Sequence, residues 1–239
     1  MSSTAGAGSA GRAVRVAVID SGVHASHPHV GGVAGGVAFD AQGRAHDDFV
    51  DRLGHGTAVT AVIREKAPAA RLYAVKVFDR DLRTEIESLL AALDWAVAQK
   101  LQLVNLSLGT AERRHAAALR DRVERAVAEG VLVVSALRSP DGEAFLPGGL
   151  PGVLPVELDW TCPRHEVRTA ELDGGRWVCR ASGYPRPIPG VPPDRNLRGL
   201  SFAVANVTGC LAQRLDGAGP VRSEDARREL ALRGSRGSE

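Results

Sequence analysis

The sequence predicts an α/β domain with a central, mostly parallel sheet and helices on both of its faces. Short runs of β-branched and apolar residues alternate with longer segments in which apolar residues recur at helical spacing. The 239 residues suffice for one such domain and are too few for two with a linker. No apolar run approaches the roughly 18 residues that a membrane span needs.

Five short runs are expected to form the strands of this sheet, because apolar runs of this length are typical of strands buried on both faces. They cover residues 14–19, 72–77, 103–106, 131–135 and 153–158.

Two amphipathic helices are expected on the faces of the sheet. In residues 84–99 the apolar residues have helical spacing, and Thr84 followed by Glu87 is a capping-box pattern at the start. Residues 111–129 have a second amphipathic pattern, and Gly130 is expected to end that helix.

Two further helices are expected to begin at His55 and at Ser201, because apolar residues follow each of them at helical spacing. Doubly wound folds build their sites where helices start at the carboxyl edge of the sheet. These two side chains are therefore expected at that edge.

We expect a single folded domain over residues 14–215. Within it, residues 163–198 are rich in Gly and Pro and predict a hairpin followed by long loops. Residues 1–13 are expected to form a flexible N-terminal tail, and residues 216–239 a charged, disordered C-terminal tail, because neither has apolar periodicity.

Composition excludes several classes of function. A net charge of +2, from 30 basic and 28 acidic residues, gives no signal for a nucleic acid or an anionic membrane as partner. The first residues lack the apolar core of a signal peptide, so a cytoplasmic location is expected. Cys162, Cys179 and Cys210 are interpreted as small buried hydrophobes, which suits a reducing compartment better than a disulfide framework.

Three short segments with flanking glycines place an acid, a base and a hydroxyl in order along the chain: Asp20, His55 and Ser201. A serine hydroxyl is a weak nucleophile that needs an imidazole to take its proton. The imidazole in turn needs a carboxylate to orient it. Taken alone, Ser201 is better explained as a helix N-cap.

The sequence around these residues resembles motifs of the subtilisin-like serine peptidases, the subtilases. The similar stretches are VAVIDSGV at 16–23, HGT at 55–57, LYAVKV at 72–77, NLSLG at 105–109 and GLSFA at 199–203. Five motifs in the family's order, within one register from residue 14 to 215, make the resemblance specific. It implies the subtilisin-like three-layer fold.

The resemblance also implies the activity of a serine endopeptidase that forms an acyl-enzyme. Ser201 would be the nucleophile, His55 the general acid and base, and Asp20 the residue that orients His55. A peptide or protein substrate would bind in an extended conformation, and no cofactor, metal, nucleic acid or membrane is implied. Substrate, cleavage site and oligomeric state stay open. The residues expected to line the substrate groove are Ser107, Leu108 and Gly109.

The chain departs from the family at the oxyanion site. Where subtilases have an Asn after the strand at 131–135, no Asn occurs here between residues 131 and 190, and Ser139 takes the position by register. Losing one such donor costs about a hundred- to a thousandfold in rate. Two hypotheses follow: a slow or substrate-assisted peptidase, or a catalytically impaired relative that binds peptides or regulates. A third, a protease dedicated to maturing one peptide precursor, is suggested by the small size and the lack of a secretion signal.

Two other departures concern metals and the N-terminus. The connector at 64–71 is short and cationic where many subtilases bind calcium, so no calcium is expected there. His24, His27 and His29 could suggest a metal cluster, but a polar loop is the preferred interpretation. Only about a dozen residues precede the first strand, so either a trimmed chain or a minimal cytoplasmic enzyme is expected.

Overall fold

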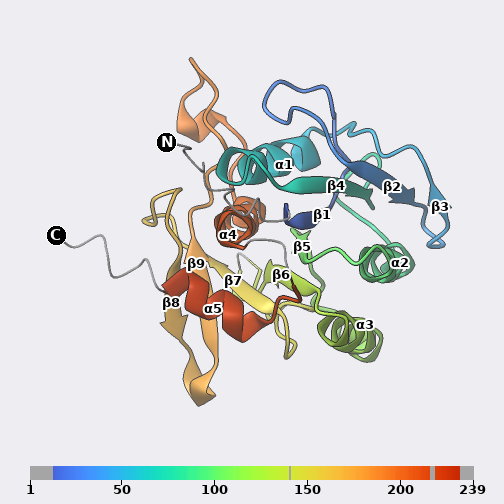
Figure 1. The fold of residues 1–239 in the computed structure, drawn as a ribbon, viewed down its shortest axis with the longest axis vertical. Coiled ribbons are helices and arrows are strands. Elements are labelled where there is room, and N and C mark those ends of the chain that lie inside the picture. Colours follow the sequence, from blue (N-terminus) through green and yellow to red (C-terminus); the bar gives the residue numbers. More distant parts are fainter. Residues whose placement is uncertain (1–12, 140, 216–218, 232–239) are drawn as a thin grey trace, which may run out of the picture.

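The computed structural model describes residues 13–139, 141–215 and 219–231. Within them, nine strands form one sheet in the order β3-β2-β4-β1-β5-β6-β7-β9-β8 (Figure 1). All neighbouring strands run parallel except the edge pairs β2–β3 and β8–β9. The strands are β1 Arg15–Asp20, β2 Gly35–Phe39, β3 Ala45–His46, β4 Arg71–Lys76, β5 Leu103–Leu106, β6 Leu132–Ala136, β7 Leu154–Leu158, β8 Arg168–Glu171 and β9 Trp177–Ala181.

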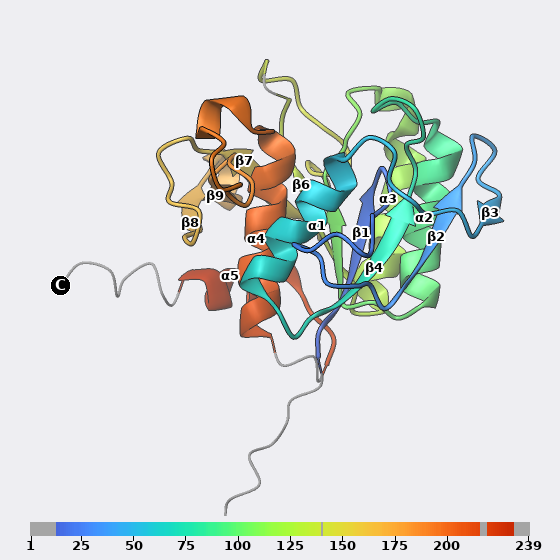
Figure 2. The ribbon, with the colours of Figure 1, turned by 90° about the horizontal axis from the view of Figure 1, so that it is seen from above.

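Helices cover both faces of the sheet, as the sequence predicts (Figures 1 and 2). One face packs against α1, α4 and α5, and the other against α2 and α3. The α-helices are α1 His55–Lys66, α2 Ile86–Ala98, α3 Ala116–Ala128, α4 Leu200–Arg214 and α5 Ser223–Ala231. Short 3-10 turns are η1 Arg113–His115, η2 Asp173–Gly175 and η3 Pro193–Arg195.

Strand β1 shows how one apolar run supplies two cores. Successive side chains of a strand point to opposite faces of the sheet. Val16 and Val18 therefore join the core beneath α1 and α4, whereas Ala17 and Ile19 join the core beneath α2 and α3. All four are buried. The five predicted strands correspond to β1, β4, β5, β6 and β7, and the sequence-based prediction of a mostly parallel sheet is confirmed.

The start of α2 differs from the capping-box prediction. The N-cap is Glu85, and its side chain makes no capping hydrogen bond. Thr84 lies one residue too early, and its hydroxyl instead faces the Glu85 carbonyl oxygen at 3.5 Å. The predicted end of the second amphipathic helix agrees with the structure. Gly130 follows α3 with a φ of 72°, which favours glycine.

The C-terminal segment also differs from expectation. Residues 219–231 are described and include α5, whose Ala226 and Leu230 are fully buried against the core beneath α4. These two apolar residues are four positions apart and share one helix face, which suffices once a core is available to dock on. The expected disorder is therefore wrong for this stretch. The remaining expected tail residues, 1–12, 216–218 and 232–239, lie outside the described residues.

The predicted hairpin in residues 163–198 is confirmed as β8 and β9. The three cysteines are free and buried, and burial raises the pKa of each thiol. Among the residues that the structure describes, no helix is long and apolar enough to cross a membrane.

Candidate active site

The order of strand addition reverses at β1, because β4 pairs with β1 on one side and β5 pairs with it on the other. Such a switch point opens a crevice at the carboxyl ends of the strands. Asp20 is the last residue of β1 and lies at that end. Figure 1 shows α1 and α4 beside β1, so their first residues are candidates for the same crevice.

Asp20 and His55 meet at the carboxyl end of β1. His55 Nδ1 lies 2.6 Å from Asp20 Oδ1, and the side chains are 15% and 1% exposed. The backbone N–H of Ser21 donates to the same Oδ1 at 2.8 Å. Burial by itself lowers the pKa of His55, but the hydrogen bond and charge of Asp20, with the charge of Asp51, outweigh it and raise that pKa.

The glycine after His55 allows this approach. A Cβ on Gly56 would lie 2.2 Å from the carbonyl oxygen of Gly22 and 3.2 Å from the Cβ of Asp20. The first turn of α1 therefore packs directly on the backbone that follows β1. Gly54, the N-cap of α1, has a φ of 82°, which favours glycine on the other side of His55.

Asp51 organises the loop before α1, and the sequence analysis missed it. It is 9% exposed, and its Oδ1 accepts the N–H groups of Leu53 and Gly54, both at 2.9 Å. Its Oδ2 accepts the N–H of Thr57 at 2.8 Å and the Thr57 hydroxyl at 2.6 Å. Burial acts to raise the pKa of Asp51, but these hydrogen bonds outweigh it and lower that pKa. An acid just before a helix start is the signal that could have found it.

Ser21 connects this loop to the Asp20 strand. Its hydroxyl donates to Asp51 Oδ1 at 2.9 Å and accepts the N–H of Gly56 at 2.9 Å. Neighbours of Asp20 and of His55 are therefore joined by buried hydrogen bonds. The network holds the two side chains in one geometry.

Ser201 is the second residue of α4, and Gly199 occupies the N-cap position with a φ of 143°. Ser201 is therefore not the cap of its helix. Its hydroxyl donates to the carbonyl oxygen of Ser107 at 3.3 Å, and no hydrogen bond of the described residues joins it to His55. The next residue, Phe202, has its ring 5.7 Å from the His55 imidazole, so α4 begins beside that imidazole.

The segment 107–109 is expected to line a substrate groove, and its first residue, Ser107, accepts the hydrogen bond of the Ser201 hydroxyl. Thr110 then pairs with Leu146 in an antiparallel bridge, with N–H to O distances of 2.9 and 2.8 Å. A Cβ on Gly109 would lie 2.9 Å from the Phe145 ring and 3.0 Å from the Leu146 carbonyl oxygen. The residues after β6 therefore back this segment closely. Its role in binding substrate stays a prediction.

Ser139, the oxyanion candidate, lies in a tight hairpin after β6. Its N–H donates to the Glu143 carbonyl oxygen at 2.8 Å, and its hydroxyl oxygen accepts the Glu143 N–H at 3.0 Å. An antiparallel bridge between Arg138 and Ala144 closes the hairpin. These bonds account for the Ser139 backbone N–H and one acceptor position of its hydroxyl. Its role as an oxyanion donor stays a prediction.

The histidine loop after β1 shows local hydrogen bonding. The N–H of His29 donates to His27 Nδ1 at 3.2 Å, and the two rings meet edge to face at 5.2 Å. Over the ranges that the structure describes, no group of three or more His, Cys, Asp and Glu side chains could hold a metal ion.

Comparison with curated proteins gives similar sequences among bacterial proteases and subtilisins. The chain is 37% identical over 140 residues to the minor extracellular protease Epr of Bacillus subtilis, which is 54% of this chain and 20% of that protein. It is 34% identical over 138 residues to subtilisin E of Bacillus subtilis, covering 54% of this chain and 35% of that protein. With subtilisin BL of Lederbergia lenta the identity is 38% over 138 residues, covering 54% and 49%. The aligned stretch thus spans from a fifth to about half of each of these relatives.

A solved structure described as the crystal structure of a lanthipeptide protease has a similar fold. The TM-score is 0.68 at 18% identity, and the match covers 90% of this chain and 78% of that one. Residues 11–144 match the model of the subtilase family, a stretch that holds Asp20, His55 and the segment 107–109 but ends before Ser201. Since that match covers more than half of the chain, the chain belongs to the subtilase family of serine peptidases.

Proposed function

We propose that the chain is a serine endopeptidase that hydrolyses peptide bonds through an acyl-enzyme on Ser201. The observation that carries the proposal is the 2.6 Å contact between His55 Nδ1 and Asp20 Oδ1, buried at the carboxyl end of β1. Family membership supports serine peptidase chemistry. The assignment of the nucleophile rests on the Ser201 motif and on its place at the start of α4, because Ser201 lies beyond the stretch that the family model matches.

The hydrogen bond to Asp20 decides what the imidazole can do. With Nδ1 donating to the carboxylate, the other ring nitrogen, Nε2, is left as an acceptor. To donate to Nε2, the Ser201 hydroxyl must leave the Ser107 carbonyl oxygen that it contacts here. Catalytic hydrogen bonds often form only when substrate is bound.

The reaction then has two stages. His55 takes the Ser201 proton as Oγ bonds to the substrate carbonyl carbon, and it delivers that proton to the amine as the C–N bond breaks. In the second stage, water attacks the acyl carbon as His55 takes its proton. His55 then returns that proton to Ser201 Oγ as the ester C–O bond breaks and the acid leaves. In this proposal the backbone N–H of Ser201, at the start of α4, stabilises the oxyanion, and Ser139 is the second candidate donor.

A role in maturing one peptide precursor is the finer form of this proposal. It is supported by the structural neighbour, which is described as a lanthipeptide protease. An extended substrate pairing its main chain with residues 107–109 would be held with little dependence on side chains. Preference for one precursor would then have to come from pockets outside that segment.

Labelling with a fluorophosphonate probe tests the proposal. Wild-type protein should be labelled, and Ser201→Ala and His55→Ala should not, whereas the surface variant Ser26→Ala should label normally. An unlabelled but folded wild type would favour the catalytically impaired peptide-binding alternative. Ser139→Asn adds a second comparison: a strong gain in turnover would show that the missing amide limits the rate.

A further inference from the structure

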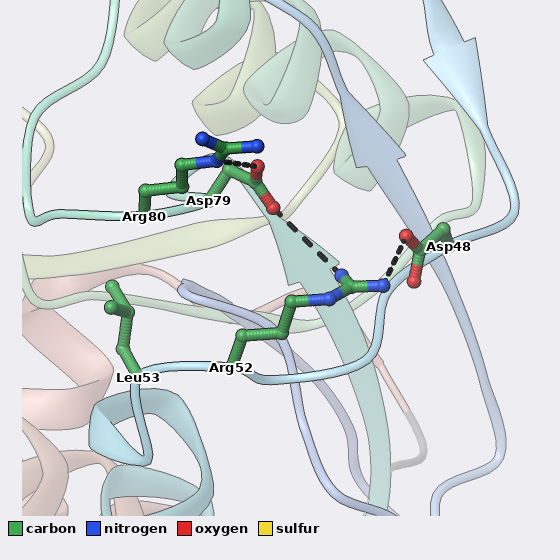
Figure 3. A pocket seen from close by; sticks show the side chains of 5 residues that line it. All are labelled: Asp48, Arg52, Leu53, Asp79 and Arg80. Atoms are coloured by element: carbon green, nitrogen blue, oxygen red, sulfur yellow. Dashed lines mark hydrogen bonds and ion pairs between the residues drawn. The ribbon is translucent and has the colours of Figure 1, made fainter.

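A cavity of about 500 Å³ opens beside the segment that leads into His55. Loops before α1 and after β4 line it, and their residues are Asp48, Arg52, Leu53, Asp79 and Arg80 (Figure 3). Only Gly54 separates Leu53 from His55. A peptide bound for cleavage at the proposed site could therefore place a side chain in this cavity.

Both carboxylates of the cavity already have a cation. Arg52 Nη2 donates to Asp48 Oδ2 at 2.8 Å, and Lys76 Nζ donates to Asp79 Oδ1 at 2.8 Å. The Lys76 side chain is only 5% exposed and does not line the cavity, so it is a buried charge that pairs with Asp79. The hydrogen bonds from Arg52 and Lys76 lower the pKa values of Asp48 and Asp79, so both are anionic at neutral pH.

The two arginines keep donor capacity toward the cavity. Arg52 Nη1 and Arg80 Nε lie 3.8 and 3.9 Å from the Asp79 carboxylate, which is beyond hydrogen-bond distance. Arg52 Nη1 has two N–H groups and donates one long hydrogen bond, of 3.5 Å, to the Val50 carbonyl oxygen. Their side chains are 51% and 95% exposed. In Figure 3 the Arg52 guanidinium lies between the carboxylates of Asp48 and Asp79, and that of Arg80 lies on the other side of Asp79. With Lys76, three cations face two anions, so the cluster has a net charge of +1.

We propose that this cavity binds an acidic side chain, Asp or Glu, of the peptide substrate through Arg52 and Arg80. This inference rests on the proposed peptidase function and names the class of its substrate. A guanidinium matches a carboxylate with two parallel N–H donors. A Lys or Arg of the substrate would meet the surplus positive charge and two carboxylates that are already neutralised, so the cavity rejects a basic side chain.

The first test profiles cleavage of a synthetic library of random 14-residue peptides by mass spectrometry. Wild type should show Asp or Glu enriched about three- to tenfold at one position near the cut, the gain of one exposed charge-assisted contact. The Arg52→Gln/Arg80→Gln double variant should lose the enrichment. Arg44→Gln is the matched control, because Arg44 pairs with Asp40 four residues earlier, as Arg52 pairs with Asp48, but does not line the cavity.

The second test measures binding without turnover, on the Ser201→Ala protein. Fluorescein-labelled alanine hexapeptides with a central Glu-Glu or Gln-Gln are compared by anisotropy. The Glu peptide should bind about three- to tenfold tighter, and less so at high salt. Equal binding of the two peptides, or a preference that persists in the double variant, would overturn the inference. A preserved Glu preference with neither library cleavage nor fluorophosphonate labelling of the wild type would instead overturn the peptidase function and leave the acidic-side-chain cavity standing.

Discussion

Removing the Asp51 carboxylate by Asp51→Ala should destabilise the protein by about 3–5 kcal/mol. The side chain accepts five hydrogen bonds, from Ser21, Leu53, Gly54 and twice from Thr57. Truncation leaves three backbone N–H groups without this acceptor, and each buried orphan costs about 1–3 kcal/mol. The Thr57 N–H is buried, so its loss costs an amount in the upper part of that range. Water can reach the half-buried N–H groups of Leu53 and Gly54, so their loss costs less. Such a loss is a large share of a typical stability of about 5–15 kcal/mol.

Urea unfolding followed by circular dichroism measures this effect. The control is Asp47→Ala in the same loop, which is exposed and should change the free energy of unfolding by no more than about 0.5 kcal/mol. Because the pKa of Asp51 is lowered in the folded state, its contribution should be complete well above 3.8, the ordinary value, and fade as the pH falls through the folded pKa. A variant as stable as Asp47→Ala at neutral pH would refute the reasoning.

Three further predictions concern the site and the C-terminal helix. The rate of fluorophosphonate labelling should rise with pH through an inflection above 6.5, since only neutral His55 accepts a proton and Asp20 raises its pKa. Asp20→Asn should lower that rate by about 10⁴ and move the inflection down, because burial is then opposed only by the charge of Asp51; an unmoved inflection would contradict the assignment. Gly56→Ala should cost at least about 1–3 kcal/mol because its Cβ would overlap the Gly22 carbonyl oxygen at 2.2 Å, and unchanged thermal unfolding would count against this packing. Leu230→Ala should cost about 2–5 kcal/mol if α5 is docked as described, and a wild-type melting temperature would mean that it is not.

Local patterns predicted the central strands and the β8–β9 hairpin well, but missed the β2–β3 edge. The runs that became β1 and β5 are buried on both faces, so their apolar character is continuous and easy to recognise. Strand β2 begins Gly35-Gly36, a pair that local propensity assigns to a turn. It is a strand because it pairs with β4. The two backbones lie so close that a Cβ on Gly36 would be 2.8 Å from the Ala74 carbonyl oxygen, so a glycine is needed there.

The candidate site shows the same division. Asp20, His55 and Ser201 were predicted because each lies in a short motif whose chemistry is evident from residue type and order. Asp51 has no such motif, and its importance comes from the groups that the fold brings around it. The C-terminal segment was misjudged for a related reason, since the apolar positions of α5 matter only where a core receives them.

The sequence by itself determined which residue types stand in which order, and hence the α/β class, the family resemblance and the three residues of the proposed triad. These features depend on periodicity and on motifs of a few residues, which the chain carries locally. Only the tertiary structure decided that Asp20 and His55, 35 positions apart, meet at 2.6 Å, and that Arg52 and Arg80 share one cavity. Contacts between distant segments depend on strand order and close packing, which arise when the whole core assembles.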